Sequence, residues 1–339
     1  MPDIGVINIF DQARQGGLVQ LRLPKNVANS RLGQAVAMCG DLLAATHFSQ
    51  EGDLGQVSIF QRDSTGWRIQ QCIELPESQV PRSLAMNGDY LAVGMGGKSA
   101  ASGKKEVVLL FQLQAGHWSL VQSLYAKDQQ VADGFGGALS LGGGNLVVGA
   151  SGANPQGPNS GAAYVFQPKN GRWFQTQKLT ASDGSFEARF GHRVEAVGNS
   201  LAISAIGHQA FGNKSGAVYL FNLEENVWVQ EQSPLFASDA SAGSYFGSSL
   251  AMRDNHLLVG ANEESTRAPE AGAAYLFHFD GAQWRQGQKL VPPHDGYKQK
   301  FGTSVAMTED RIVIAATGEN YHAGALYVFE AIETALQKN

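Results

Sequence analysis

The stretch that decides the fold is residues 301–329, which reads Phe-Gly-Thr-Ser-Val-Ala-Met at 301–307, Arg-Ile-Val-Ile-Ala-Ala at 311–316 and Gly-Ala-Leu-Tyr-Val-Phe at 324–329. The same three-part phrase recurs upstream, and its copies open on Phe135-Gly136, Phe190-Gly191 and Phe246-Gly247. Consecutive Phe-Gly pairs lie 55 or 56 residues apart. A fixed period slightly above fifty residues is typical of a repeat protein.

Each repeat reads as four short strands. Residues 248–252 are small and apolar, as suits an innermost strand, and residues 146–150 form a continuous apolar run typical of a strand buried on both faces. Residues 217–221 alternate, and residues 173–179 begin at a Trp and alternate outward. The sequence therefore predicts an all-β protein, and four-stranded sheets repeated radially make a β-propeller.

Counting first strands gives the number of blades. Phe-Gly or a degenerate equivalent occurs at positions 32, 80, 135, 190, 246 and 301. We therefore expect six blades in a single domain over 1–339, with seven as the alternative. The predicted repeats are 32–79, 80–131, 132–186, 187–242, 243–298 and 299–329.

The chain ends carry strands that do not fit a simple count. Residues 5–10 resemble a third strand and residues 18–23 a fourth, whereas nothing after Phe329 resembles a fourth strand. We expect the N-terminal strands within 5–23 to complete the C-terminal blade, because closure covers an exposed strand edge. The sequence leaves open whether residues 5–10 lie outside 18–23 or displace 324–329.

Composition narrows the function classes. Glycine accounts for 41 of 339 residues, which suits many tight turns, and a net charge of −5 gives no reason to expect nucleic acid as a partner. No apolar run approaches the roughly 20 residues that span a bilayer, so we expect no membrane insertion. Cys39 and Cys72 carry neither a disulfide framework nor a metal pattern. We predict no cofactor and leave the oligomeric state open.

The N-terminus, Met-Pro-Asp-Ile-Gly, lacks a basic segment followed by an apolar one. This favours a cytoplasmic location. A chain trimmed of its signal peptide would look the same, and the protein would then be exported.

These repeats resemble the FG-GAP repeat family, found in the β-propellers of integrin α-chains and of related bacterial and fungal proteins. The resemblance runs from Gly5 to Phe329 and is strongest from Phe135 onward. It implies a propeller, usually of seven blades. The name-giving Gly-Ala-Pro is Gly-Ala-Ser at 149–151 and Gly-Ala-Asn at 260–262. Many family members hold Ca²⁺ in a loop between the first two strands, but here those loops are short and lack Asp-x-Asp-x-Asp, so we predict no metal.

Loop length indicates where binding could occur. The connections between second and third strands, such as 151–160 and 206–215, are long, and so are those between repeats, such as 181–189 and 237–245. In an up-and-down blade both sets emerge on the same face. Loops on a rigid scaffold carry most binding residues, so we expect this loop face to be the working surface.

Acidic, aromatic and histidine side chains recur in these loops. An Asp recurs between repeats, and it could recognise ligand hydroxyls, amines or cations, or could bond the backbone N–H groups of its own loop. Recurrence with the repeat favours the structural interpretation, and Tyr321-His322 is the better candidate for exposure. The candidate ligand-binding residues are Asp128, Asp183, Glu187, His208, Asp239, Asp295, Tyr321 and His322.

The repeated large aromatics are interpreted as structural. Each of the five Trp residues begins a fourth strand, which favours packing, and the Phe of each Phe-Gly pair is expected to wedge between blades. Catalytic motifs such as His-Glu-x-x-His, Gly-x-Ser-x-Gly and a phosphate loop are absent, so we predict no catalytic residue.

Three hypotheses for function follow. The first is a non-enzymatic binding or scaffold module that presents its loop face to a partner protein. The second is a lectin, because some propellers of the resembled family bind sugars in pockets between blades. The third is a hydrolase or lyase with a site near a central channel.

Overall fold

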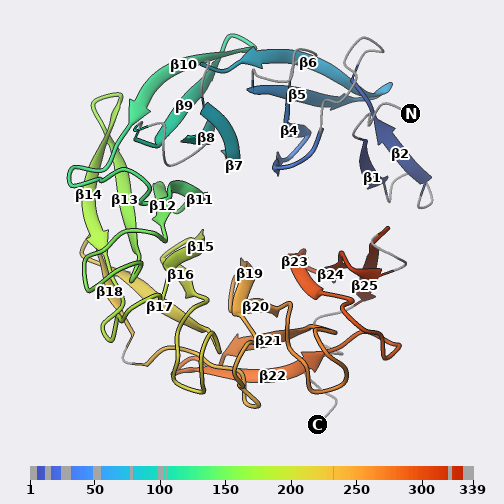
Figure 1. The fold of residues 1–339 in the computed structure, drawn as a ribbon. Helices are drawn as coiled ribbons and strands as arrows, with labels where there is room; N and C mark the ends of the chain where they lie inside the picture. The colour runs from blue at the N-terminus through green and yellow to red at the C-terminus, as the bar shows by residue number, and fades with distance from the viewer. Residues whose placement is uncertain are drawn as a thin grey trace. The chain divides into compact units, whose positions relative to one another are not determined.

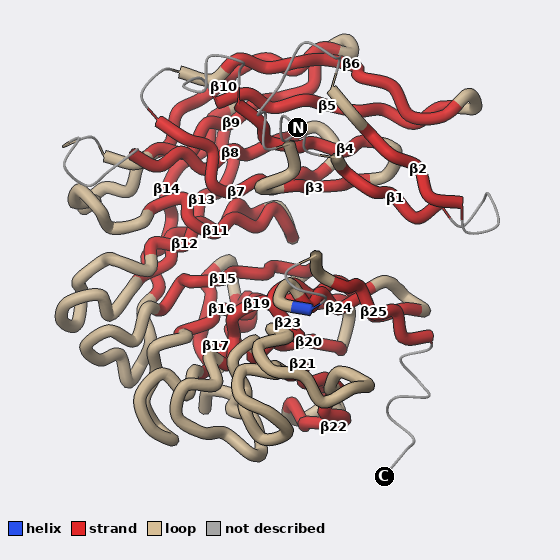
Figure 2. The backbone as a smooth tube through the Cα atoms, turned by 45° about the vertical axis from the view of Figure 1, so that its right-hand side comes forward, coloured by secondary structure: helices blue, strands red, loops and turns tan. Residues whose placement is uncertain are grey.

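The computed structural model describes residues 6–11, 17–23, 32–48, 55–76, 79–97, 103, 105–231, 233–319 and 323–330. Within these ranges the regular structure is β-strand, apart from a helical turn at Glu319 (Figure 2). No helix among them is long and apolar enough to cross a membrane. The chain divides into two compact units, Met1–Leu141 and Gly142–Asn339. The prediction of a single domain over 1–339 stays a prediction.

The first unit contains eleven of the described strands. They are β1 (Ile7–Asp11), β2 (Gly17–Leu21), β3 (Val36–Cys39), β4 (Leu42–Phe48), β5 (Gly55–Asp63), β6 (Gly66–Glu74), β7 (Gln79–Asn87), β8 (Tyr90–Gly97), β9 (Val107–Gln114), β10 (His117–Leu124) and β11 (Phe135–Gly142). Sheets β3–β6 and β7–β10 each have four strands in chain order.

The second unit begins at Gly142, the last residue of β11. Its strands are β12 (Asn145–Ala150), β13 (Ala162–Lys169), β14 (Arg172–Leu179), β15 (Phe190–Val197), β16 (Ser200–Ala205), β17 (Ala217–Glu224), β18 (Val227–Gln230), β19 (Phe246–Arg253), β20 (His256–Ala261), β21 (Ala273–Phe279), β22 (Trp284–Leu290), β23 (Phe301–Met307), β24 (Arg311–Ala316) and β25 (Ala325–Glu330). The first strands β15, β19 and β23 lie side by side, with β18 and β22 on the outside (Figure 1).

The predicted all-β architecture of four-stranded sheets is confirmed. Five sheets have four strands in chain order, and β23–β25 form a sixth of three strands within the described residues. β1 and β2 pair only with each other, from Ile7↔Leu21 to Asp11↔Gly17. Completion of the last sheet by residues 18–23 therefore stays a prediction.

The Phe-Gly pairs hold neighbouring sheets together, as predicted. Phe190, Phe246 and Phe301 are fully buried. The Phe246 ring lies 5.6 Å from Tyr275 in its own sheet, and its backbone forms a parallel bridge with Gly216 of the preceding sheet. The following Gly247 has φ 93°, a conformation that glycine adopts without strain.

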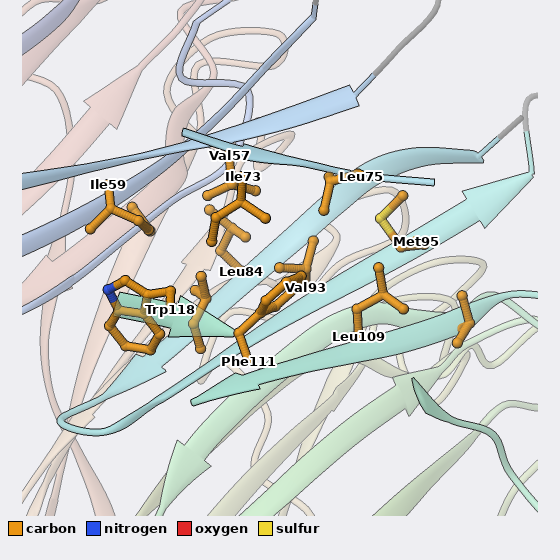
Figure 3. Close-up of a cluster of buried hydrophobic side chains, with 13 residues drawn as sticks. Val57, Ile59, Ile73, Leu75, Leu84, Val93, Met95, Leu109, Phe111 and Trp118 are labelled. Atoms are coloured by element: carbon orange, nitrogen blue, oxygen red, sulfur yellow. The ribbon is translucent and has the colours of Figure 1, made fainter. Parts of the chain in front are cut away.

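The core lies between the faces of successive sheets. In the first unit one cluster joins Val57 and Ile73 of the first four-stranded sheet to Leu84, Val93 and Trp118 of the next (Figure 3). Such face-to-face packing requires apolar side chains on both faces of the middle strands. The predicted packing role of the Trp residues holds for Trp118, Trp173 and Trp228, which are buried, whereas Trp67 and Trp284 are only half-buried.

Candidate binding surfaces of the second unit

Long loops of the second unit are tied together by backbone hydrogen bonds. At three junctions, the loop entering a repeat donates three N–H groups to carbonyls in the preceding repeat's loop between its second and third strands. The donor–acceptor pairs are Glu187–Pro158, Arg189–Asn159 and Phe190–Ser160; Gly243–Asn213, Tyr245–Lys214 and Phe246–Ser215; and Lys298–Pro269, Lys300–Glu270 and Phe301–Ala271, at 2.9–3.1 Å. These nine bonds form what we call the loop ladder. The loops, drawn in tan, gather on one side of the unit (Figure 2).

The loop ladder requires left-handed backbone at recurrent positions. Glu187 and Arg189 have φ 58°, and Lys298 and Lys300 have φ 56° and 58°. Residues with a Cβ rarely adopt this conformation, because the Cβ crowds the following carbonyl. The left-handed conformation therefore recurs at the residues whose N–H groups form the inter-repeat bonds.

Side chains reinforce the ladder in a different way at each junction. Asn159 donates to Glu187 at 2.9 Å, and Arg189 pairs with the same carboxylate at 3.1 Å. Lys214 lies 5.5 Å from the centre of the Tyr245 ring. Lys300 pairs with Glu270 at 2.6 Å and with Glu263 at 2.8 Å. The predicted site residue Glu187 is thus part of a junction.

Two of the predicted Asp residues accept hydrogen bonds from tyrosines of the following repeat. The Tyr219 hydroxyl donates to Asp183 at 2.5 Å, and the Tyr275 hydroxyl donates to Asp239 at 2.8 Å. Both tyrosines are buried, and a buried phenol requires a partner. The structure thus adds a role that neither sequence interpretation of these Asp residues included.

Each of these two carboxylates has a second partner. His208 is buried and its Nε2 lies 3.1 Å from Asp183. Lys289 lies 2.6 Å from Asp239 and 3.3 Å from the buried Glu264. Burial opposes ionisation of Asp183 and Asp239, but the hydrogen bonds outweigh it and hold the pKa of each below its usual value. Burial and then the carboxylate hydrogen bond raise the pKa of both tyrosines.

Asp295 departs from this pattern because it lies one residue later in its repeat. His294 is seven residues before Phe301, as Asp183 is before Phe190. Asp295 instead pairs with Arg267 at 2.6 Å. In the last repeat, the hydroxyl of Tyr327, the counterpart of Tyr275, donates instead to Glu319 of its own repeat at 2.5 Å. Burial and then this hydrogen bond raise the pKa of Tyr327 to about 12.

The remaining predicted site residues are Asp128, Tyr321 and His322. Asp128 is exposed in the first unit, in the loop after β10. Tyr321 and His322 lie outside the described residues. The structure brings Asp183 together with His208, and Glu187 lies in the same inter-repeat loop, whereas Asp239 and Asp295 lie at the next two junctions. Their ligand-binding role stays a prediction.

Exposed aromatic side chains lie on the same loops. Phe186 and Tyr297 occupy matching positions, four residues before the Phe of the next strand, and are 59% and 67% exposed. The intervening repeat has Ala242 at this position, and the backbone of Gly212 approaches Ala242 closely. Phe211, next to that glycine, is 50% exposed. The loop face therefore carries three large exposed rings on fixed backbone.

Phe211 belongs to a small aromatic cluster beside Asp183. The ring centres of Phe211 and Phe236 are 5.2 Å apart, and those of His208 and Phe236 are 5.5 Å apart. The cluster places a partly exposed carboxylate, an imidazole and an exposed ring within one loop region.

Strand β15 carries ionisable residues that sequence reasoning did not select. His192, Arg193 and Glu195 stand where β23 has Thr303, Ser304 and Ala306. Burial, helped by Arg193, lowers the pKa of His192 to about 3, and burial raises the pKa of Glu195 to about 7. The signal in the sequence was charge at positions where β11, β19 and β23 have Gly, Ala, Ser or Thr. Over the described ranges, no three His, Cys, Asp or Glu side chains are grouped as metal ligands.

Comparison with known proteins identifies the family to which these repeats belong. The FG-GAP repeat model matches residues 118–166, 173–221, 228–277 and 284–329, together more than half of the chain. The chain belongs to the FG-GAP repeat family. Each FG-GAP match begins at a Trp and ends within the third strand of the next sheet, so it crosses a junction. The match over 173–221 contains both Asp183 and Tyr219, and that over 228–277 contains both Asp239 and Tyr275.

Mouse and human integrin alpha-11 are each 27% identical to the chain over 140 residues, which cover 37% of the chain. The match spans only 12% of the length of these relatives.

Two solved structures share the FG-GAP protein's fold. A Lactobacillus plantarum protein aligns with a TM-score of 0.56 and 13% identity over 96% of this chain and 90% of that chain. The β-propeller domain of the trilobed protease from Pyrococcus furiosus aligns with a TM-score of 0.50 and 9% identity over 87% and 79%. The fold is a β-propeller, as predicted.

Proposed function

We propose that this FG-GAP protein is a non-enzymatic binding module, and that the loop face of its second unit contacts a partner protein. The observation that carries the proposal is the presence of Phe186, Phe211 and Tyr297, each at least half exposed, on loops fixed by the ladder. Large exposed rings favour protein interfaces, where aromatic residues are enriched at the centre.

Rigidity of the loops adds to the case. Binding through mobile loops costs conformational entropy at each ordered side chain, and a preorganised surface avoids much of this cost. Nine inter-repeat backbone bonds hold the loops in one conformation before any partner arrives. Charged pairs such as Lys300–Glu270 lie on the same set of loops as the rings and would form a polar rim.

The relatives supply limited support. The matched segment of integrin alpha-11 is 27% identical, and the chain corresponds to a small part of that protein. The Pyrococcus furiosus structure is the propeller domain of a protease. At 9% identity it shares only its fold with this chain, and a shared fold does not imply protease activity.

Site-specific photocrosslinking tests the proposal. A benzophenone amino acid would replace Phe211 in one variant and Phe174 in another. Phe174 is the matched control, because it is 49% exposed but lies on the outer strand β14 rather than on a loop. We expect a discrete crosslinked protein at 211 that is absent at 174 and is lost when Phe186 and Tyr297 are both changed to Ser. Equal labelling at 211 and 174 would contradict the proposal.

A glycan is the second candidate partner, and the aromatic cluster beside Asp183 is the observation that favours it. An exposed ring next to a carboxylate and an imidazole suits the apolar face and the hydroxyls of a sugar. A glycan array with the wild type and with Asp183→Ala and Asp239→Ala separates the candidates. A lectin would bind a glycan that Asp183→Ala releases, and an array without any bound glycan removes this alternative.

A further inference from the structure

A cavity of about 510 Å³ is lined by residues of the fourth and fifth repeats. Strand β17 runs from the ladder, next to Gly216, to Asn222 and Glu224 in the cavity wall. The volume is in the range of sites for small organic ligands. The rest of the lining comes from the end of β18 and the segment after it, and from Phe279 and Trp284 of the fifth repeat.

One extra residue in the fourth repeat opens this cavity. Leu235 follows Trp228 by seven residues, whereas Leu179 follows Trp173 by six. β18 accordingly ends at Gln230. The Glu231 N–H still donates to the Leu220 carbonyl of β17 at 2.8 Å, and Leu235 bridges Val218. Pro234 lies just before this bridge and cannot donate a ladder hydrogen bond. Ser233 and Pro234, which lie between these two contacts, form part of one wall.

The fifth repeat supplies an aromatic wall that other repeats lack. Phe279 stands where the preceding repeats have Leu223 and Pro168 opposite their Trp residues. Its ring lies 5.7 Å from that of Trp284. Both side chains are half-buried. The extra residue of the fourth repeat and the Phe279 of the fifth repeat thus both contribute to this one cavity.

The charges in the lining are all of one sign. Glu224 and Glu231 line the cavity, and no described Lys, Arg or His side chain does. Asn222 donates to Glu231 at 3.2 Å, and the Trp284 indole also donates to it. Burial raises the pKa of Glu231 despite these two bonds. A carboxylate held by neutral donors beside aromatic faces lacks the counter-charge that would stabilise it most.

We propose that this cavity binds an organic cation, an ammonium or guanidinium group, between the Phe279–Trp284 rings and the carboxylates of Glu224 and Glu231. The aromatic faces attract a cation through their quadrupoles, and the carboxylates pair with its N–H donors. A neutral sugar would use the rings but would leave two negative charges unpaired. The site is independent of the proposed protein-binding loop face.

Titration followed by NMR tests this site. The Trp284 indole N–H reports on the cavity directly, and Trp284→Phe assigns its signal. The probes are N-acetylarginine amide, N-acetyllysine amide and putrescine, with N-acetylcitrulline amide as the neutral match for arginine. We expect the cations to shift the Trp284 indole signal and citrulline to bind at least about fivefold more weakly than arginine. Tighter binding of the amides identifies a polypeptide side chain as the ligand, and tighter binding of putrescine identifies a free amine.

Matched variants make the test specific. Glu231→Gln should weaken arginine amide binding at least about fivefold, and Phe279→Leu should weaken it about threefold. Glu225→Gln is the control, because it removes the same charge one residue from Glu224 but outside the lining. The thermal unfolding midpoint of each variant confirms that it folds. Equal binding of arginine and citrulline, equal losses in Glu231→Gln and Glu225→Gln, binding of saccharides alone, or no shift with any probe would each overturn the proposal.

Discussion

The hydroxyl of Tyr275 donates a hydrogen bond at 2.8 Å to Asp239, which lies 36 residues earlier in the preceding inter-repeat loop. Tyr219 and Asp183 repeat this relationship with the same separation. Each pair joins the loop that leaves one sheet to the third strand of the next sheet. The recurrent aspartates of the loop face therefore couple neighbouring repeats.

Loss of one such bond should weaken the second unit. Tyr275→Phe keeps the buried ring but removes the donor to Asp239, which still pairs with Lys289. We expect the free energy of unfolding to fall by about 1–2 kcal/mol, measured by urea denaturation. Tyr327→Phe is the comparison, because that hydroxyl bonds to Glu319 within its own repeat. An unchanged Tyr275→Phe protein would show that the junction does not depend on this bond.

The glycine after each wedge Phe should tolerate no side chain. Gly302 has φ 86°, and a Cβ there would lie 2.3 Å from the carbonyl oxygen of Ala273. Gly281 has a similar φ of 95° but open space around it. We expect Gly281→Ala to cost about 1 kcal/mol for the backbone alone, and Gly302→Ala to cost about 3 kcal/mol or more because it adds a steric clash. Thermal denaturation of both variants gives the difference, and equal costs would refute the close approach.

The carboxyl of Glu195 should make stability depend on pH. Burial raises its pKa to about 7 from an ordinary 4.5, so the folded state holds the proton more tightly than the unfolded state does. This contribution is fully present below pH 4.5 and is lost as pH rises through 7. Glu195→Gln should therefore be more stable than the wild type at pH 8 by about 1–3 kcal/mol. The two proteins should differ little at pH 4.5.

Thermal unfolding of the wild type and Glu195→Gln at both pH values measures this difference. A variant that is less stable than the wild type at pH 8 would mean that the ionised carboxylate is favourably paired.

Much of the fold could be predicted because local residues encode it. The Phe-Gly pair specifies both a buried wedge and a left-handed glycine, so its spacing marks each junction, as at Phe246-Gly247. The Trp at the start of each fourth strand marks the outer edge in the same way. These features depend on a few adjacent residues, which makes them visible in a linear sequence.

The candidate site was less predictable, because it depends on contacts between repeats. The recurrence of Asp183 and Asp239 was visible, but their tyrosine partners are 36 residues away and reach them only when two sheets pack. Asp295 is offset by one residue from the other two aspartates and pairs with Arg267, and only the structure shows this consequence of the offset. The cavity had a signal, the extra residue between Trp228 and Leu235, but its meaning depends on Phe279 in the next repeat.

Amide hydrogen exchange of the free protein tests the central claim, that the loops form a preorganised surface. The backbone N–H groups of Arg189, Tyr245 and Lys300 donate across junctions, although all three residues lie in loops. The account predicts that these amides exchange more than about a hundredfold more slowly than unprotected loop amides, within the range of neighbouring strand amides. Exchange of all three at the rate of an unstructured chain would contradict it.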